Sequence, residues 1–176
     1  MRILIGHASR QGATAEIAER IAEIFRQISD EVDVLPMKEA KSVEGYDGVV
    51  LGSAIHNQAW LPEASDFLYR QSGNLAGTPI WLFSVGMSAG LPAPLRGPGR
   101  RAQEKRIAQA FPVEVRPRNH RVFSGVGSPD LLPRWGRFLF RAAGGRFGDY
   151  RDWAGIEEWA KSIARDLHGP ESMPQP

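Results

Sequence analysis

The stretch ILIGHASRQGAT, residues 3–14, decides how this chain folds. Its first three residues are apolar and consecutive, which is typical of a strand that is covered on both faces. A helix is predicted over Thr14–Ile28, because isoleucines recur there at intervals of three and four residues. The residues Ala8–Thr14 between strand and helix are small or polar. The sequence therefore predicts a strand, a polar loop and a helix N-terminus in direct succession.

This polar loop has the chemistry of an anion-binding site. The backbone amides of a first helical turn have no partner within the helix, and the helix dipole favours negative charge beside them. Ser9 and Thr14 add hydroxyl donors, and Arg10 adds a positive charge. Gly12 permits a positive φ or a close approach of the backbone. We therefore expect the loop to hold a phosphate monoester without a metal ion, the alternative being an ordinary turn with Thr14 as the helix cap.

Two common nucleotide-binding motifs fit this loop less well. A Walker A loop requires Gly-Lys followed by Ser or Thr, whereas here Gly12 is followed by Ala13 and Thr14. A dinucleotide-binding fingerprint requires three spaced glycines, and the stretch has only Gly6 and Gly12. If the loop binds a phosphate, we therefore expect that phosphate to belong to a ligand other than those that Walker A loops and dinucleotide-binding folds bind.

Strand and helix signals alternate along the rest of the chain. Apolar runs predict strands over Arg2–Gly6, Val32–Leu35, Gly48–Ser53, Thr78–Val85 and Arg116–Val126. Helical patterns cover Pro62–Gln71, Arg100–Ala110 and Asp152–Leu167. This alternation predicts an α/β fold whose parallel sheet has helices on both faces. Such sheets bind ligands at the carboxyl ends of their strands, where we expect the loops Gly6–Thr14, Gly52–Leu61 and Ser84–Gly90.

The composition excludes several classes of protein. The chain has 176 residues, so one domain is the expectation, and it has no Cys, which excludes disulfides and Cys-ligated metals. No His, Asp or Glu residues have the spacing of metal ligands, so no metal site is predicted. No run of about 18 apolar residues is present to span a membrane. We therefore expect a cytoplasmic protein.

The charge of the chain is unevenly distributed. Residues 96–151 carry 13 Lys or Arg against 4 Asp or Glu, whereas residues 1–95 carry 7 against 11. This basic block suggests a localised anionic partner, the alternative being a solvated loop that is rich in Arg. Nucleic acid is not expected as that partner, because no recognition motif accompanies the charge.

The motifs, in their order, resemble the flavodoxin-like family, and within it the branch of the menaquinone-dependent protoporphyrinogen oxidases of haem biosynthesis. The first loop, Ala8–Thr14 with the following Glu16-Ile17-Ala18, carries most of the resemblance. Weaker matches follow in the same order at Val49–Ile55, Phe123–Val126, Trp135–Phe138 and Asp152-Trp153. The resemblance covers about residues 1–168. It marks about 127–151 as a basic insertion and leaves 169–176 as a tail that we expect to be disordered.

The resemblance implies a doubly wound sheet of five parallel strands in the order 2-1-3-4-5, with one non-covalent FMN. The first loop would bind the phosphate, and the second and third loops would border the flavin ring. The residues implied at the cofactor are Ser9, Arg10, Gln11, Gly12, Ala13, Thr14, Ser53, Ala54, Ile55, His56, Asn57, Ser84, Val85, Gly86 and Met87. Flavodoxins usually stack aromatic side chains on the ring. Here the second loop offers His56 and Trp60, and the third offers none.

The resemblance also implies an FMN-dependent oxidoreductase, similar to protoporphyrinogen dehydrogenases, that passes electrons to a quinone or another redox partner. FMN would supply the chemistry, and the chain would supply position and electrostatics. Two alternatives remain open. One is a flavodoxin-type electron carrier without an organic substrate. The other is a flavin-free module that binds an anion on the same fold.

The segment 131–141 combines large aromatic and basic side chains. If it is helical, Trp135 and Phe138 lie on one side, and the other side carries Arg134, Arg137 and Arg141. Such a helix suits peripheral contact with the anionic inner face of a membrane. It equally suits a porphyrin-like substrate, whose propionates pair with Arg. The alternative is core packing with the Arg heads in water.

Three histidines need separate interpretations. His56 would lie at the edge of the flavin and modulate its protonation, or be an exposed loop residue. His7, just after the first strand, is expected to make a structural hydrogen bond. His120 lies in an Arg-rich strand and is expected at the surface.

Overall fold

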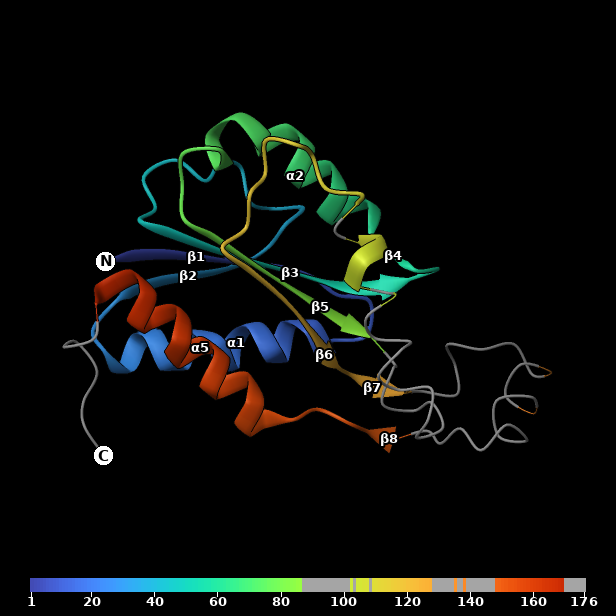
Figure 1. The fold of residues 1–176 in the computed structure, drawn as a ribbon. Helices are drawn as coiled ribbons and strands as arrows, with labels where there is room; N and C mark the ends of the chain where they lie inside the picture. Colours follow the sequence, from blue (N-terminus) through green and yellow to red (C-terminus); the bar gives the residue numbers. More distant parts are fainter. Residues whose placement is uncertain are drawn as a thin grey trace.

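A parallel sheet forms the centre of the molecule (Figure 1). The computed structural model describes residues 1–86, 102, 104–107, 109–127, 135, 138 and 148–169. The parallel strands run in the order β2-β1-β3-β5-β6, which confirms the predicted fold and the order 2-1-3-4-5 once the short β4 is set aside. The strands are β1 Arg2–Ala8, β2 Glu31–Pro36, β3 Gly48–His56, β5 Ile80–Gly86 and β6 Asn119–Ser124, with β4 Ala59–Trp60 paired antiparallel to β3.

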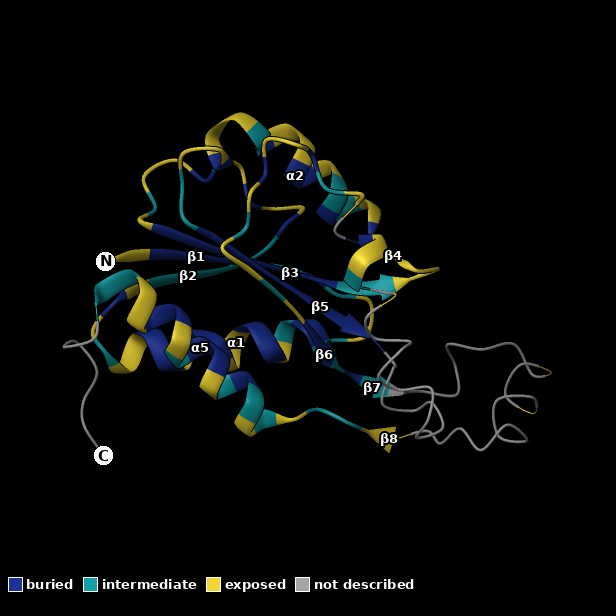
Figure 2. Ribbon diagram, viewed as in Figure 1, coloured by how far each residue is buried: buried dark blue, intermediate teal, exposed yellow. Residues whose placement is uncertain are grey.

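Helices cover both faces of this sheet. Figure 1 shows α1 (Ala13–Gln27) and α5 (Trp153–His168) on one face and α2 (Pro62–Leu75) on the other. Ile3 and Ile5 pack toward α1 and α5, whereas Leu4 packs toward α2, because successive residues of a strand point to opposite faces. Both faces of the sheet are therefore buried, as Figure 2 shows, which explains the uninterrupted apolar runs in the sequence.

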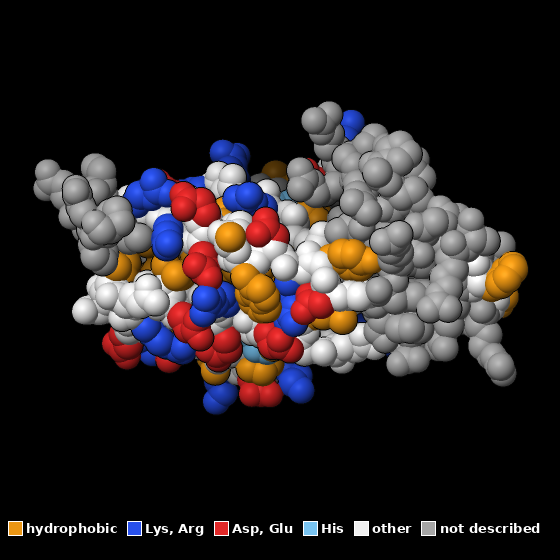
Figure 3. Space-filling view, turned by 90° about the horizontal axis from the view of Figure 1, so that it is seen from below, with side chains coloured by type: hydrophobic (Ala, Val, Ile, Leu, Met, Phe, Trp, Pro, Cys, Tyr) orange, Lys and Arg blue, Asp and Glu red, His pale blue; other side chains and the backbone are white. Residues whose placement is uncertain are grey.

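The outer surfaces of α1 and α5 carry acidic and basic side chains side by side (Figure 3). Arg20 on α1 bridges Glu23 one turn away and Glu157 on α5, with nitrogen–oxygen distances of 2.6 Å in both pairs. Asp152 caps the N-terminus of α5 by accepting a hydrogen bond from the Gly155 amide at 3.0 Å. None of the described helices has the length and apolarity that crossing a membrane requires.

The structure changes some predicted boundaries. The strand predicted over Arg116–Val126 is divided into β6 and a second strand, β7 (Val126–Gly127), which pairs antiparallel with β8 (Gly148–Asp149). Helix α2 extends to Leu75 rather than ending at Gln71. Of the helix predicted over Arg100–Ala110, residues 104–107 are helical. Residues 87–90 of the predicted third loop, residues 128–134, 136–137 and 139–147 of the predicted insertion and residues 170–176 of the tail lie outside the described residues. A single domain over 1–168 stays a prediction.

Close packing beneath the sheet edge requires a glycine at position 52. A Cβ atom at Gly52 would lie 2.0–2.3 Å from ring atoms of Phe83, which is fully buried in β5. The Phe83 ring also packs edge-on against Trp159 and at a tilt against Phe123, so a shift of the ring would disturb these contacts. The absence of a side chain at Gly52 therefore lets β3 and the aromatic core approach each other.

We predict that Gly52→Ala destabilises the protein by about 1–3 kcal/mol, because overpacking forces a shift of side chains or backbone. Gly73→Ala adds the same methyl group in α2, where nothing lies within 4 Å. That control is expected to raise stability by up to about 1 kcal/mol through helix propensity. Urea unfolding of both variants measures the difference. Equal stability of the two would contradict the packing argument.

Candidate cofactor site

The carboxyl ends of the strands surround a cavity of about 240 Å³. The described residues that line it come from the β1–α1 loop and the start of α1, the end of β3 and the turn after it, the end of β5, and the start of β7 with the residue before it. They are Ser9, Arg10, Gln11, Ala13, Thr14, Ala54, Ile55, His56, Asn57, Val85, Gly86, Gly125 and Val126. Pockets for small molecules usually exceed about 300 Å³. A ligand of the size of FMN would therefore extend beyond these residues along the sheet edge.

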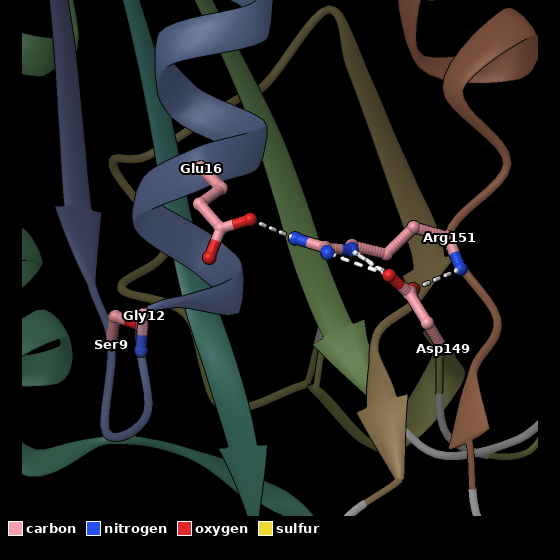
Figure 4. Close-up of polar contacts among 5 residues, drawn as sticks. All are labelled: Ser9, Gly12, Glu16, Asp149 and Arg151. Carbon is pink, nitrogen blue, oxygen red and sulfur yellow. Dashed lines mark hydrogen bonds and ion pairs between the residues drawn. The ribbon is translucent and has the colours of Figure 1, made fainter.

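The first loop turns sharply into α1 at Gly12. Gly12 precedes the helix with φ +88° and ψ −28°, a left-handed conformation that disfavours a side chain. Its amide donates to Ser9 Oγ at 3.0 Å, and its carbonyl accepts from the Glu16 amide at 2.9 Å. Figure 4 shows Ser9 and Gly12 in the turn that precedes α1. Ser9 therefore holds the loop closed while its own hydroxyl hydrogen remains available to an acceptor in the cavity.

The start of α1 presents hydrogen-bond donors to the cavity. The amides of Ala13 and Thr14 have no carbonyl partner within the described part of the chain, as expected for a first helical turn. Thr14 is 1% exposed and lines the cavity, and its hydroxyl makes no hydrogen bond to a described residue. A buried hydroxyl normally has a partner. This donor set fits phosphate oxygens, so the residues present fit the phosphate of FMN.

The second loop meets the first through two side chains. Arg10 Nη1 lies 3.1 Å from both Nδ1 and Nε2 of His56. His56 is the last residue of β3, and Asn57 and Gln58 follow with φ of 50° and 63° before β4 begins. Two successive positive φ angles between paired His56 and Ala59 define a tight two-residue hairpin. The predicted loop Gly52–Leu61 is therefore a hairpin whose tip borders the cavity.

Two of the residues implied at the cofactor face away from the cavity. Ser53 and Ser84 are fully buried and do not line it. Ser53 Oγ accepts from the Leu61 amide at 3.0 Å and donates to the Ala54 carbonyl at 2.9 Å. Ser84 Oγ accepts from Trp60 Nε1 at 2.7 Å and lies 2.9 Å from His120 Nε2. Both hydroxyls thus hold the second loop against the sheet.

His120, which was expected at the surface, is partly buried. Its ring contacts Phe111 edge-on, with ring centroids 5.6 Å apart, and its Nε2 reaches Ser84. Burial lowers the pKa of His120 to about 4, because the charged form loses its hydration. The neutral ring and the Ser84 hydroxyl then share one hydrogen bond between Nε2 and Oγ. Trp60 is 6% exposed and bound to Ser84, so His56 is the aromatic side chain that the second loop brings to the cavity.

The structural hydrogen bond expected for His7 is absent within the described part of the chain. His7 Nδ1 is buried and has no hydrogen-bond partner there. Burial lowers the pKa of His7, while Glu19 and Glu39 oppose the shift. His7 does not line the cavity at the sheet edge.

Two further residues implied at the cofactor are not among those that line the cavity. Gly12 shapes the first loop but does not line the cavity, and Met87 lies outside the described residues. Gly125 and Val126 line the cavity although sequence reasoning did not assign them to the site. The sequence signal that could have assigned them to the site is the segment Phe123–Val126 at the end of the last predicted strand, which resembles the family. No cluster of three His, Asp or Glu side chains suited to a metal occurs among the described residues.

The fold and the site define a doubly wound α/β protein whose first helix begins with free amides at a cavity on the carboxyl edge of the sheet. The model of the flavodoxin domain matches residues 4–142, and the chain belongs to this family. Proteins of this family use FMN, which confirms the expected cofactor at the level of the family.

Individual proteins agree with this assignment. The chain is 26% identical to the protoporphyrinogen IX dehydrogenase [quinone] of Escherichia coli K12, over 93% of this chain and 95% of the relative. Oxidised flavodoxin 2 of Bacillus cereus aligns with a TM-score of 0.58 and 24% identity, over 94% of this chain and 99% of that one. A flavodoxin of Pseudomonas aeruginosa aligns with a TM-score of 0.60 and 14% identity, over 96% and 100%. These two structures support the fold.

We predict that His120 makes the stability of the protein depend on pH. Unfolded His120 takes up its proton near pH 6.5, whereas the folded protein resists protonation until about pH 4. The unfolded state therefore binds more protons between these values, and stability declines as the pH falls through this window, by up to about 3 kcal/mol. Urea unfolding at several pH values measures the decline.

The His120→Gln variant should lose this component of the pH dependence, and the difference from the unmodified protein separates it from the titration of carboxylates. Proton NMR of the ring gives the pKa of His120 directly. A value near 6.5 would contradict the buried placement of the ring.

Proposed function

We propose that this chain binds FMN with its phosphate in the first loop and its ring along the carboxyl edge of the sheet. The observation that carries the proposal is the helix N-terminus at this edge, where unpaired amides and the unpartnered Thr14 hydroxyl face a cavity. The phosphate contacts are assigned to Ser9, Arg10, Gln11, Gly12, Ala13 and Thr14. The ring contacts are assigned to Ala54, Ile55, His56, Asn57, Val85, Gly86 and, as a prediction from sequence alone, Met87.

The chain's own residues account for phosphate recognition without a metal ion. The amides of Ala13 and Thr14 and the hydroxyls of Ser9 and Thr14 are fixed donors, so they need little reorganisation when an anion arrives. Arg10 adds charge at the mouth of the cavity, where His56 contacts it. Ser53 and Ser84 contribute by holding the second loop rather than by touching the ligand.

FMN supplies the redox chemistry when it is bound. The chain positions the ring beside a hairpin fixed by backbone pairing and by the Trp60–Ser84 hydrogen bond. Second-loop side chains cover part of the ring and keep water from it. The function is therefore oxidation–reduction through a bound flavin, with a protein or a quinone as the electron partner.

We place the chain more narrowly with the protoporphyrinogen dehydrogenases that use a quinone. Support comes from the Escherichia coli relative, whose likeness extends over 93% of this chain, and from the basic block that a porphyrin's propionates would suit. The electron carrier without an organic substrate is the second candidate, favoured by the likeness to flavodoxins over nearly their whole length.

We further propose peripheral contact with an anionic membrane surface through the segment 131–141. Trp135 and Phe138 are 70% and 73% exposed. The same segment carries Arg134, Arg137 and Arg141 in sequence. Large aromatic side chains next to basic ones suit the interface of an anionic bilayer, where a quinone is dissolved.

Thr14→Val is predicted to weaken FMN binding about tenfold or more, because a hydrogen bond to a charged phosphate is lost without a change in shape. Riboflavin, which has no phosphate, should bind the variant as it binds the unmodified protein. Quenching of flavin fluorescence measures both affinities. Thr78→Val is the matched control, since the Thr78 hydroxyl donates to the Asn74 carbonyl away from the cavity. An unchanged FMN affinity in Thr14→Val would place the phosphate elsewhere.

The FMN-loaded protein is predicted to oxidise protoporphyrinogen IX in the absence of oxygen when a naphthoquinone is supplied. Fluorescence of the porphyrin product measures the rate. With quinone dissolved in anionic phosphatidylglycerol vesicles, changing Arg134, Arg137 and Arg141 together to Gln should lower the rate severalfold. With a water-soluble quinone, the same variant should match the unmodified protein. No turnover with either quinone would identify the electron carrier instead.

A further inference from the structure

A cluster of charges joins the β7–β8 pair to the first turn of α1. Arg151 Nη1 donates to Glu16 Oε2 at 2.5 Å, and its Nε and Nη2 donate to the Asp149 carboxylate at 2.6–3.1 Å (Figure 4). The guanidinium also lies 4.6 Å from the centre of the Trp153 ring. The side chain of Arg151 is only 11% exposed, although it is a cation. It is therefore held in one orientation from several sides.

Glu16 brings a negative charge to the edge of the phosphate loop. A Cβ atom placed on Gly12 would lie 3.6 Å from Glu16 Oε1, and the Glu16 amide bonds the Gly12 carbonyl. A carboxylate in the first turn of a helix interacts favourably with the helix dipole. Beside a bound phosphate, however, the same carboxylate repels the ligand unless a cation neutralises it.

Arg151 is the cation in position to neutralise Glu16. Asp149 fixes the guanidinium and raises the pKa of Arg151, so the side chain stays charged throughout the working pH range. Arg10 contacts His56 instead, and Arg20 bonds Glu23 and Glu157. The antiparallel pairing of Val126 with Asp149 brings the chain back toward the first turn of α1, so that Arg151 reaches Glu16.

We propose that Arg151 determines the preference of the site for FMN over riboflavin by cancelling the charge of Glu16 beside the phosphate. This inference rests on the proposed position of the phosphate in the first loop. Arg151 acts through Glu16 and is a positioning residue rather than a contact of the flavin ring. The return of the chain after the basic insertion thus contributes to the cofactor site.

The test compares FMN with riboflavin in four proteins: the unmodified chain, Arg151→Gln, Glu16→Gln and the double variant. Arg151→Gln should weaken FMN binding about three- to tenfold, because an uncompensated and partly screened carboxylate repels the phosphate. Riboflavin affinity should change less than about twofold. Glu16→Gln should bind FMN as tightly as the unmodified chain or more tightly. The double variant should bind FMN about as tightly as the unmodified chain, although it lacks the ion pair between Arg151 and Glu16.

Arg20→Gln is the matched control. Arg20→Gln also removes a positive charge from an ion pair that joins α1 to a segment far along the chain, here Glu157 on α5. Arg20 lies one helical turn further from the first loop than Glu16 does. Its FMN affinity should stay within about twofold. Arg151→Lys should keep most of the preference for FMN, and the loss in Arg151→Gln should shrink at high salt.

The outcomes separate this inference from the proposed function. If the unmodified chain binds FMN no better than riboflavin, the phosphate is not in the first loop and the proposed site fails. If that preference exists but Arg151→Gln retains it, or weakens both ligands equally, the role of Arg151 is overturned. A double variant as weak as Arg151→Gln would also overturn it. Should Arg151→Gln not fold, Glu16→Gln carries the test, and a loss of FMN affinity in that variant contradicts the inference.

Discussion

The site depends on one constraint: β1 must end, and α1 must begin, within a few residues at the carboxyl edge of the sheet. The apolar residues Ile3–Ile5 anchor the strand between two layers of helices, and the buried face of α1 anchors the helix beneath it. The turn between them needs the left-handed conformation of Gly12, which Ser9 stabilises. Because both anchors lie in the core, the free amides of α1 are held rigidly where a ligand arrives, and folding itself preorganises the site.

Most of the fold was predictable because its signals are local. Apolar runs identify buried parallel strands, isoleucine spacing identifies α1, and alternation of the two requires a layered α/β fold. The strand order came from resemblance rather than from the patterns. What could not be predicted were features fixed by tertiary contacts. The strand over Arg116–Val126 divides at Gly125, whose amide bonds the Gly86 carbonyl, and the chain then turns to pair with β8.

The site was predictable where the backbone sets it and less so where side-chain direction does. The strand–helix turn alone brings Ser9, Arg10, Gln11, Ala13 and Thr14 to the cavity. Ser53 and Ser84 are paired neighbours in β3 and β5, and they share the α2 face with residues two positions earlier. Their neighbours Ala54 and Val85 line the cavity instead. The contact between Glu16 and Arg151 spans 135 residues and has no local signal.

Phosphate recognition in the proposed complex rests on fixed dipoles more than on net charge. The described charged side chains nearest the loop are balanced in number: Arg151 pairs with Glu16 and Asp149, and Arg10, which contacts His56, supplies the second positive charge. A balanced set does not attract every anion, and the amides and hydroxyls of the first turn select one that fits their geometry. Within the proposed function, the excess positive charge of residues 96–151 other than Arg151 is available to a second anionic partner, for which we proposed a porphyrin's propionates or the headgroups of a membrane. If both proposals hold, recognition of the phosphorylated cofactor and of a second anion would depend on different parts of the chain, fixed dipoles for the first and net charge for the second.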